Sequence, residues 1–473
     1  SGRGVDLNSQ PVDCMCAPLS LRIEPVALSG TPQQIYARLS DRHATVLLES
    51  AKPMAGLSGW SYIAGPAAAT LETRDGTTRL HGCGTDATWA DPFEALRSLP
   101  HPTAPRPAGL SFAGGLIGYL GYDLARHIER LPSVAPTDPA LPDLRLHLAD
   151  HVLAFDHAQA QWYFCTTQWP WCDAAARARV WEHTMAQARS GSEMAGSFDA
   201  TTLTSRTSDA IYLEQVRQCK NYIADGHVFQ INLSRRLDGP FHGDAFALYA
   251  ALTAANPAPF AAFVPGENFA IASASPERFL RLTEGTVTAR PIKGTRPRGA
   301  TAQQDQQLHD ELQASEKDRA ENLMIVDLMR NDLGRVARTG SVRVQDLFQI
   351  EAHPSVWQMV STVQAQLRAG ATAIDLLRAC WPPGSMTGAP KVRAMEIIEA
   401  LEPLRRGPYA GAIGYFDAGG AMDLSVVIRT AIVHGDRVSV QVGGAVVADS
   451  DPADELAETQ DKGRLLLQTL QRV

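Results

Sequence analysis

The sequence has no C-x-x-C pair, no apolar run long enough to span a membrane and no excess of positive charge. Its seven cysteines at irregular spacing predict reduced thiols and a cytoplasmic protein. Cys14 and Cys16 lie close together, but no second pair completes a metal site around them. The missing apolar run argues against a membrane protein, and the net charge of −8 argues against a general nucleic-acid binder. An anionic small substrate remains compatible with that charge, because a local cluster of Arg and Lys outweighs a negative total.

Composition places the chain among globular proteins and divides it into two regions. Hydrophobic residues make up 45% and charged residues 20% of the 473 positions, a typical balance for a folded protein. Residues 188–208 are small, polar and without apolar periodicity, as in a linker. We therefore expect a strand-rich N-terminal region over 17–187 and a mixed region over 209–472. The strands expected in the first region lie at 44–50, 60–65 and 110–123.

Residue spacing predicts both strands and helices in the second region. Apolar and β-branched runs bounded by turns predict strands at 269–274, 277–283, 286–292, 411–416, 422–433 and 437–442. Helical spacing predicts helices at about 306–332, from near Pro390, and from Pro452 to about Leu470. Asp451 is a good start signal for the last helix, because Asp caps free N–H groups and proline fits the first turn.

The motif R-P-I-K-G-T-R-P-R-G at 290–299 sets Lys293 in a glycine-flanked, cationic loop. Its prolines fix the backbone, while Gly294 and Gly299 allow a ligand to come close. The fixed positive charges come from Arg290, Arg296 and Arg298. A buried lysine beside other cations has a lowered pKa, and its neutral amine is a nucleophile. A solvated basic turn fits the motif equally well, so the motif alone leaves both interpretations open.

A predicted hairpin ends beside this lysine. Two β-prone runs flank a Glu-Gly turn at 284–285, and a two-residue turn pairs Leu282 with Val287. This register sets Glu277 opposite the residue before Lys293, and a one-residue bulge would set it opposite Lys293 itself. Either way a carboxyl and an amine meet at the open end of the hairpin. A cross-strand salt bridge is the commoner use of such a pair, so a catalytic role is one of two interpretations.

Two predicted helices each carry a pair of carboxylates on one face. The pairs are Asp318 with Glu321, and Glu455 with Glu458. Lys462 lies one turn beyond the second pair. A solvated acidic surface explains either helix alone. Both together, beside an anion-binding loop, favour one Mg²⁺ held through two carboxylates and several waters.

Other segments suit an anionic ligand. The run C-W-P-P-G-S-M-T-G-A-P-K at 380–391 passes through small residues to a helix start, and its free backbone N–H groups and hydroxyls suit a carboxylate or phosphate. Later strand ends offer a tyrosine, a glycine pair and Arg429, which suits bidentate binding of a carboxylate. A structural ion pair is an equally good interpretation of Arg429.

Together these strings resemble the chorismate-utilising enzymes, over essentially the whole of 212–471. The matching motifs are H-V-F-Q-I-N-L-S-R (227–235), S-P-E-R-F (275–279), P-I-K-G-T-R-P-R-G (291–299), D-R-A-E-N-L-M-I-V-D-L (318–328), P-G-S-M-T-G-A-P-K (383–391), I-R-T (428–430) and E-L-A-E-T-Q-D-K (455–462). The first region is similar at L-L-E-S (47–50) and F-A-G-G-L-I-G-Y-L-G-Y-D (112–123). The resemblance implies an α/β (α+β) sandwich of two large antiparallel sheets with helices outside. It also implies a first region of the anthranilate synthase component I type and a chorismate-binding catalytic region over 209–472.

Within this family the nucleophile distinguishes the members. Where water attacks, a lysine base occupies the position of Gln230. Anthranilate synthase, in which ammonia attacks the ring directly, carries P-I-A-G-T. This chain carries P-I-K-G-T and resembles the members that aminate chorismate at C4. The resemblance implies that Lys293 attacks C2 and the C4 hydroxyl leaves; ammonia then attacks C4 and expels the lysine. The product would be 4-amino-4-deoxychorismate, on the route to 4-aminobenzoate and folate.

The resemblance also implies individual roles. Lys293 would be the nucleophile and Glu277 the acid for the leaving hydroxyl, which requires a neutral carboxyl. The implied metal set is Glu321 and Glu458 as direct Mg²⁺ ligands, with Asp318 and Glu455 acting through water. The residues implied to contact the substrate are Thr387, Tyr409, Arg429, Gly443, Gly444, Lys462 and Gln358. At Gln358 the chain departs from the family, which usually has histidine there. Because glutamine carries no proton, more of the acid role would fall to Glu277.

Partners and alternatives follow from the same comparison. L-L-E-S and N-P-A-P-F-A-A-F (256–263) resemble the family's tryptophan pocket, through Ser50, Pro257 and Phe260. No cysteine lies in a glutaminase-type elbow, so ammonia would come from a separate glutamine amidotransferase (glutaminase) subunit or from solution. The alternatives are anthranilate synthase component I, disfavoured by Lys293, and a tryptophan-binding regulatory subunit with weak activity, disfavoured because the acid, the lysine and the four metal-site carboxylates are all retained.

Overall fold

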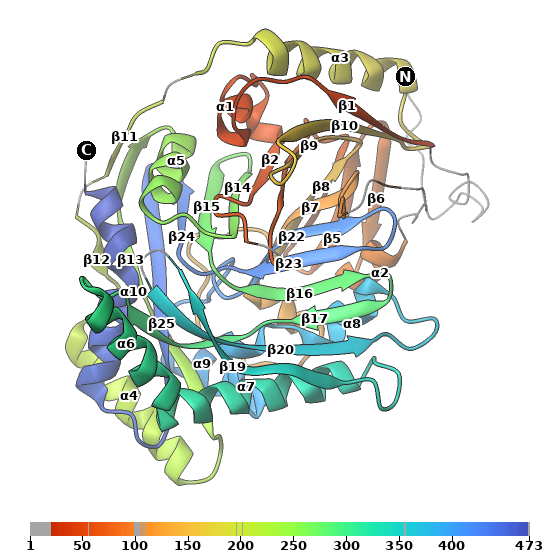
Figure 1. The fold of residues 1–473 in the computed structure, drawn as a ribbon. Helices are drawn as coiled ribbons and strands as arrows, with labels where there is room; N and C mark the ends of the chain where they lie inside the picture. The colour runs from red at the N-terminus through yellow and green to blue at the C-terminus, as the bar shows by residue number, and fades with distance from the viewer. Residues whose placement is uncertain are drawn as a thin grey trace.

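A computed structural model describes residues 20–54, 56–98, 106, 109–194, 196–200, 202–353 and 356–471. Two large antiparallel sheets pack together with helices on their outer sides (Figure 1), which confirms the predicted α/β (α+β) sandwich. Cys14 and Cys16 lie outside the described residues. No helix within these ranges is both long enough and apolar enough to cross a membrane.

The first sheet has 13 strands in the described part of the chain. Its order is β1 (Ser20–Val26), β10 (Gln161–Gln168), β9 (His151–Asp156), β3 (Trp60–Ala64), β2 (Val46–Glu49), β14 (Phe260–Pro265), β15 (Phe269–Ser275), β24 (Thr430–His434), β25 (Arg437–Val446), β13 (Gln230–Gly243) and β11 (Phe198–Ala200). Two short strands, β12 (Thr204–Ser205) and β21 (Gly388–Ala389), also pair with β13. Because β2 pairs with β14, the sheet joins the two sequence regions.

The second sheet has 12 strands in the same residues. Its order is β18 (Ile292–Pro297), β20 (Val356–Gln366), β17 (Thr286–Ala289), β16 (Arg278–Thr283), β23 (Met422–Val426), β22 (Ala412–Asp417), β7 (Gly115–Leu120), β8 (Leu144–Ala149), β4 (Ala69–Arg74), β5 (Thr77–Gly82) and β6 (Thr85–Trp89). β19 (Arg343–Ala352) pairs with β20. Here β7 pairs with β22, so this sheet also joins the two regions.

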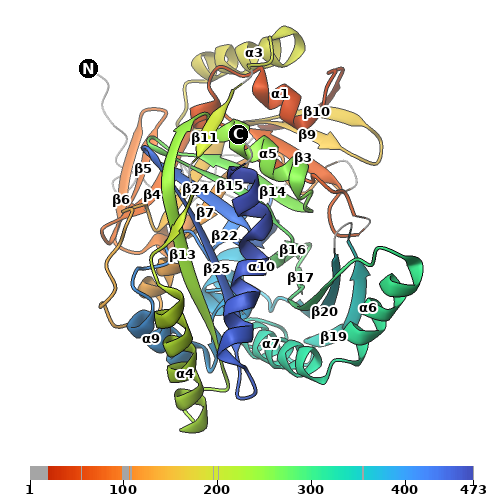
Figure 2. The same ribbon diagram turned by 90° about the vertical axis from the view of Figure 1, so that its left-hand side faces the viewer.

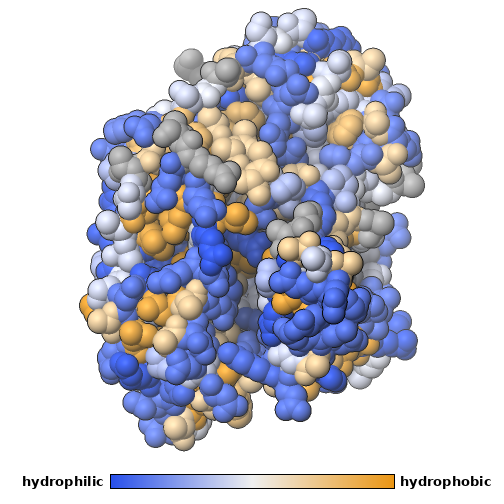
Figure 3. All heavy atoms as spheres, turned by 60° about the vertical axis from the view of Figure 1, so that its left-hand side comes forward, coloured by the Kyte–Doolittle hydropathy of each residue, from blue (hydrophilic) through white to orange (hydrophobic). Residues whose placement is uncertain are grey.

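Helices cover the outer faces of both sheets. They are α1 (Pro32–Ala37), α2 (Pro92–Arg97), α3 (Ala174–Ser190), α4 (Asp209–Ala224), α5 (Ala245–Ala255), α6 (Ala302–Ala314), α7 (Glu316–Gly334), α8 (Ala373–Cys380), α9 (Lys391–Leu401) and α10 (Pro452–Leu470). α10 runs along β25 (Figure 2). A core of apolar side chains from both sheets lies between them, and Phe112 stacks on Tyr415 there with ring centroids 4.7 Å apart. On the face shown in Figure 3 the surface is hollowed near its middle, and both hydrophilic and hydrophobic side chains border the hollow.

Several predicted elements are confirmed, and three are interrupted. The hairpin pairs Leu282 with Val287 as expected, and the last helix spans the predicted residues. The predicted strand 422–433 divides into β23 and β24, because Arg429 has a left-handed backbone with φ 51°. The predicted strand 286–292 likewise ends with β17, and β18 begins at Ile292. The predicted helix 306–332 divides into α6 and α7 at Ser315, whose side chain accepts the Asp318 N–H and caps α7.

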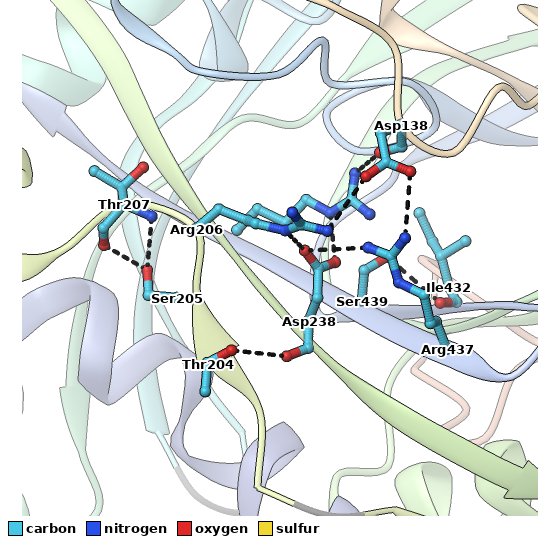
Figure 4. Close-up of polar contacts among 10 residues, drawn as sticks. Asp138, Thr204, Ser205, Arg206, Thr207, Asp238, Ile432, Arg437 and Ser439 are labelled. Atoms are coloured by element: carbon cyan, nitrogen blue, oxygen red, sulfur yellow. Dashed lines mark hydrogen bonds and ion pairs between the residues drawn. The ribbon is translucent and has the colours of Figure 1, made fainter.

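The predicted linker segment contains regular structure. Residues 188–190 belong to α3, and both β11 and β12 lie between 191 and 208. Just after β12, Arg206 forms ion pairs with Asp238 on β13 and with Asp138, from a loop of the first region (Figure 4). Arg437 on β25 also binds Asp138, at 3.4 Å. These contacts fix the segment against the first sheet.

Candidate active site

Lys293 lies in an irregular stretch of β18. The register between β18 and β20 shifts between Ile292 and Thr295, so Lys293 and Gly294 leave the regular ladder. Gly294 has φ 91°, and a Cβ there would lie 2.9 Å from the Asp318 Cβ. The glycine is therefore needed because helix α7 packs against the backbone at this position. The sequence had predicted that Gly294 makes room for a ligand instead.

The three arginines of the motif do not form the cationic surroundings that the sequence predicts for the lysine. Each pairs with a carboxylate of its own: Arg290 with Glu351, Arg296 with Asp318, and Arg298 with Asp305. Burial is the main cause that lowers the pKa of Lys293. Glu321 opposes this shift, and the cation that adds to it is Lys462 on α10.

Glu277 is buried immediately before β16, and its surroundings fit an acid. Burial raises its pKa to about 6, although the Ser385 hydroxyl, Lys293 and the Ile292 backbone N–H stabilise the charged form. The hairpin thus brings Glu277 and Lys293 together, as expected. A carboxyl with this pKa is partly protonated near neutral pH and is suited to donate a proton.

Ser385 links the acid and the lysine, and no pattern of side chains along the chain indicates this role. It lies in a 3₁₀ turn, η4 (Gly384–Met386), and its carbonyl oxygen accepts hydrogen bonds from Lys293 Nζ at 3.2 Å and Asn232 Nδ2 at 3.1 Å.

The expectation of free backbone N–H groups in this turn is wrong at two positions, because those of Met386 and Thr387 donate to the carbonyls of Pro383 and Gly384. Thr387 is fully buried, and its carbonyl accepts the Asn232 backbone N–H at 2.8 Å.

Carboxylates from α7 and α10 face this lysine. Glu321 is buried, and burial raises its pKa to about 7 against the effect of Lys293. Glu458 forms a 2.5 Å ion pair with Lys462, and Lys293 helps to lower its pKa. Glu455 accepts a hydrogen bond from the Ser450 hydroxyl at 2.6 Å, while its Oε2 is buried without a partner in the described residues. Glu321, Glu455 and Glu458 therefore concentrate negative charge around one space.

This oxygen-rich set fits Mg²⁺ in part. Buried carboxylates, one with an unpartnered oxygen, are the hard donors that this ion prefers, and one or two of them usually suffice. Within the described ranges, no three His, Cys, Asp or Glu residues are grouped closely enough to hold a metal alone. Asp318 pairs with Arg296 at 2.9 Å, which engages its carboxylate. The residues that would hold Mg²⁺ are therefore Glu321 and Glu458, with Glu455 beside them.

Three of the predicted substrate-binding residues, Lys462, Gly443 and Gly444, lie beside the carboxylates of α10. Lys462 donates to the Gly443 carbonyl at 3.0 Å. A Cβ on Gly443 would lie 2.6 Å from the Leu233 carbonyl oxygen and 3.0 Å from the Tyr409 hydroxyl, and one on Gly444 would lie 2.9 Å from Glu455 Oε2. The glycine pair therefore lets β13, Tyr409 and the acidic helix come close to β25.

Arg429 and Gln358 complete the predicted set. Burial lowers the pKa of Arg429, and Glu277 opposes that shift. Arg429 has no carboxylate within ion-pair distance among the described residues, which disfavours a structural ion pair and leaves its guanidinium for a ligand. Gln358 is buried on β20, and its Oε1 has no partner in the same residues.

A separate cavity of about 520 Å³ lies between the two sheets. Ser50 and Phe260 line it, together with Arg278, whose guanidinium lies 4.9 Å from the Phe260 ring centroid. The third residue predicted for a tryptophan pocket, Pro257, is exposed and does not line the cavity; Pro259 does. Two of the three predicted residues thus share one pocket.

The chain belongs to the family of chorismate binding enzymes, because residues 44–468 match that family. It is 41% identical to aminodeoxychorismate synthase component 1 of Klebsiella aerogenes, over 92% of this chain and 96% of the relative. It is 39% identical to anthranilate synthase component 1 of Streptomyces coelicolor, over 94% of this chain and 87% of that relative. Among solved structures, it is similar to anthranilate synthase component I of Streptococcus pneumoniae, with a TM-score of 0.78 and 29% identity over 93% of this chain and 99% of that one.

Proposed function

We propose that the protein is an aminodeoxychorismate synthase component 1, which converts chorismate and ammonia to 4-amino-4-deoxychorismate for 4-aminobenzoate and folate synthesis. The observation that carries this proposal is the lysine itself. Lys293 has a lowered pKa and lies beside the proton donor Glu277 and the acidic helices. Relatives that make anthranilate are almost as similar to this chain, so the side chain at this position decides between the two products.

The first step uses Lys293 and Glu277 together. The neutral Nζ attacks C2 of chorismate, both ring double bonds shift by one position, from C1=C2 to C1=C6 and from C5=C6 to C4=C5, and the bond from C4 to its hydroxyl breaks. Glu277 donates its proton, so the hydroxyl leaves as water. The new bond leaves an extra proton on Nζ, and the Glu277 carboxylate takes it up. The protonated acid is thereby restored before the second step.

The second step replaces the lysine with nitrogen. Ammonia attacks C4, both double bonds shift back, and the bond from C2 to Nζ breaks. The extra proton on the incoming nitrogen passes to Nζ, which leaves as an amine. When bound between Glu321 and Glu458, Mg²⁺ would neutralise the ring carboxylate of the substrate. Tyr409, Arg429, Lys462 and the Gly443–Gly444 pair would hold its carboxylates and its enolpyruvyl group, with Thr387 and Gln358 beside the ring.

Two partners belong to this proposal. A glutamine amidotransferase subunit would supply the ammonia. The cavity lined by Ser50 and Phe260 would bind tryptophan, because it is largely apolar and offers Arg278 and Asp423 as charged groups for an amino acid.

The proposed function is tested by product analysis without a partner subunit. Chorismate, an ammonium salt and Mg²⁺ are incubated with the purified chain, and the products are separated and identified by mass spectrometry. We expect 4-amino-4-deoxychorismate as the main product. Anthranilate as the main product would contradict the proposal and assign the chain to the other branch.

A further inference from the structure

The strand β13 presents two carboxamide side chains to the interior of the molecule. Successive residues of a strand point to opposite faces. Ile231 and Leu233 pack outward in a core with Tyr212 of α4. Gln230 comes just before Ile231, and Asn232 lies between Ile231 and Leu233. The side chains of Gln230 and Asn232 therefore point to the opposite face of the strand, toward the candidate active site.

Both carboxamides carry polar atoms without partners. Gln230 is fully buried, and neither its Oε1 nor its Nε2 has a hydrogen-bond partner among the described residues. Asn232 is buried too, and its Oδ1 is likewise unpartnered. Burying such groups without a partner is costly, so a buried amide of this kind indicates a ligand or a water. The free atoms offer two acceptors and one donor group.

The contacts of Asn232 place this wall beside the nucleophile. Its Nδ2 and the Nζ of Lys293 donate to the same oxygen, the carbonyl of Ser385, at 3.1 Å and 3.2 Å. Gln230 pairs with Ala389 in the short strand β21, and β21 begins directly after Thr387. Both carboxamides therefore lie along the turn that also contacts Lys293 and Glu277.

We propose that Gln230 and Asn232 form the site that holds the incoming ammonia. This inference rests on the proposed function, because it names the position of the second reactant at the same site. Ammonia has three N–H donors and one lone pair. Two amide oxygens accept from it and the Gln230 NH₂ group donates to its lone pair, which fits the unpartnered atoms. The neutral carboxamides give up no proton at neutral pH, so they do not convert the bound ammonia to ammonium and its lone pair stays free to attack.

The step from this site balances without another reactant. The amide oxygens hold two N–H groups while the lone pair leaves the Gln230 NH₂ group and forms the bond to C4. The bond from C2 to Nζ breaks, and the third proton of the incoming nitrogen passes to Nζ. A carboxamide that only orients ammonia should therefore affect the second step and leave the first unchanged.

The test separates the two steps in three variants. Gln230→Met keeps the volume of the side chain and removes its polar atoms, and Asn232→Ala is the second variant. The matched control is Gln215→Met on α4, whose carboxamide is also buried with an unpartnered Oε1 but binds the Leu401 carbonyl outside the site. For each protein, KM is measured for ammonium and for chorismate. Adduct formation is measured from the intact mass with chorismate and no ammonium, where the adduct adds chorismate less one water.

We expect Gln230→Met and Asn232→Ala each to raise KM for ammonium by about tenfold, the effect of one or two neutral hydrogen bonds. KM for chorismate and the yield of adduct should match those of the wild type, and Gln215→Met should change none of these. An unchanged KM for ammonium in both variants would overturn the ammonia site, and so would an equal loss of adduct. A wild-type protein that makes anthranilate or no adduct would contradict the proposed function instead, whatever the variants do.

Discussion

Glu277 and Lys293 lie together at the open end of one hairpin, and each favours the charged form of the other. Burial outweighs this attraction at both residues. It raises the pKa of the carboxyl to about 6 and lowers the pKa of the amine. The pair therefore has a higher fraction of neutral acid and neutral amine than the same groups in water, which is the state that the first step requires.

The first prediction concerns pH. The acid must be protonated, so kcat/KM should fall as the pH rises above about 6, the pKa of Glu277. Glu277→Gln should lose most activity, and the residual rate should lack this decline. Stability should respond in the same sense. A carboxyl whose pKa is raised by folding stabilises the protein when protonated, and that contribution is lost as the pH rises through about 6. Glu277→Gln should therefore unfold at a higher temperature than the wild type at pH 8, but not at pH 4.5. Equal melting temperatures at pH 8 would contradict the buried, charge-disfavouring site.

The second prediction distinguishes the acidic residues by their response to Mg²⁺. Glu321→Gln should abolish the rise in melting temperature that Mg²⁺ gives the wild type. Asp318→Asn should retain most of it, because the Asp318 carboxylate is already paired with Arg296. In the wild type the affinity for Mg²⁺ should weaken below about pH 7, where protons compete for Glu321. Thermal unfolding with and without Mg²⁺ measures the first effect, and titration calorimetry at two pH values measures the second. A larger loss in Asp318→Asn than in Glu321→Gln would refute the assignment.

A third prediction concerns the buried ion pair behind the site. Arg406 and Glu402 are almost fully buried and lie 2.7 Å apart, and Arg406 also donates to the carbonyls of Met386 and Asn232. Glu402→Leu leaves the guanidinium unpaired, which should cost about 3–5 kcal/mol of unfolding free energy. The double variant with Arg406→Leu should recover part of that loss. Urea denaturation measures this, and a single variant as stable as the wild type would show that the pair contributes nothing.

The fourth prediction tests the cavity between the sheets. L-tryptophan should raise the melting temperature of the wild type. Ser50→Leu should remove this response, because the larger side chain fills part of the cavity and the serine hydroxyl no longer binds the Trp60 carbonyl. The response to Mg²⁺ serves as the control for folding and should survive in this variant. A wild-type protein indifferent to saturating tryptophan would leave the cavity without its proposed ligand.

Local patterns in the sequence were enough to predict the hairpin, the last helix and its cap, because each depends on neighbouring residues. The break at Ser315 also had a local signal, since Ser followed three residues later by Asp is a typical helix start. The left-handed backbone of Arg429 had no such signal, because a non-glycine residue adopts it only when tertiary contacts require it.

Within the site, the motifs indicated that Glu277 and Lys293 lie together, but they did not reveal the contacts between distant segments. Proximity along the chain suggested that the arginines next to Lys293 would lower its pKa, but each has its own carboxylate, and the effective cation is Lys462 on a distant helix. Ser385 contributes mainly through a backbone carbonyl, which no side-chain pattern reveals. Asp318 was assigned to the metal by its spacing from Glu321, although Arg296 engages it.

The central claim is that Lys293 is the nucleophile for amination at C4, and the product made by Lys293→Ala tests it most directly. Wild type and variant are compared with chorismate, ammonium and Mg²⁺ under identical conditions, and each product is identified by mass spectrometry and by its absorption spectrum. We predict that the wild type makes 4-amino-4-deoxychorismate. We predict that Lys293→Ala folds and still binds chorismate but makes none of this product. Unchanged formation of the C4-aminated product by Lys293→Ala would contradict the account.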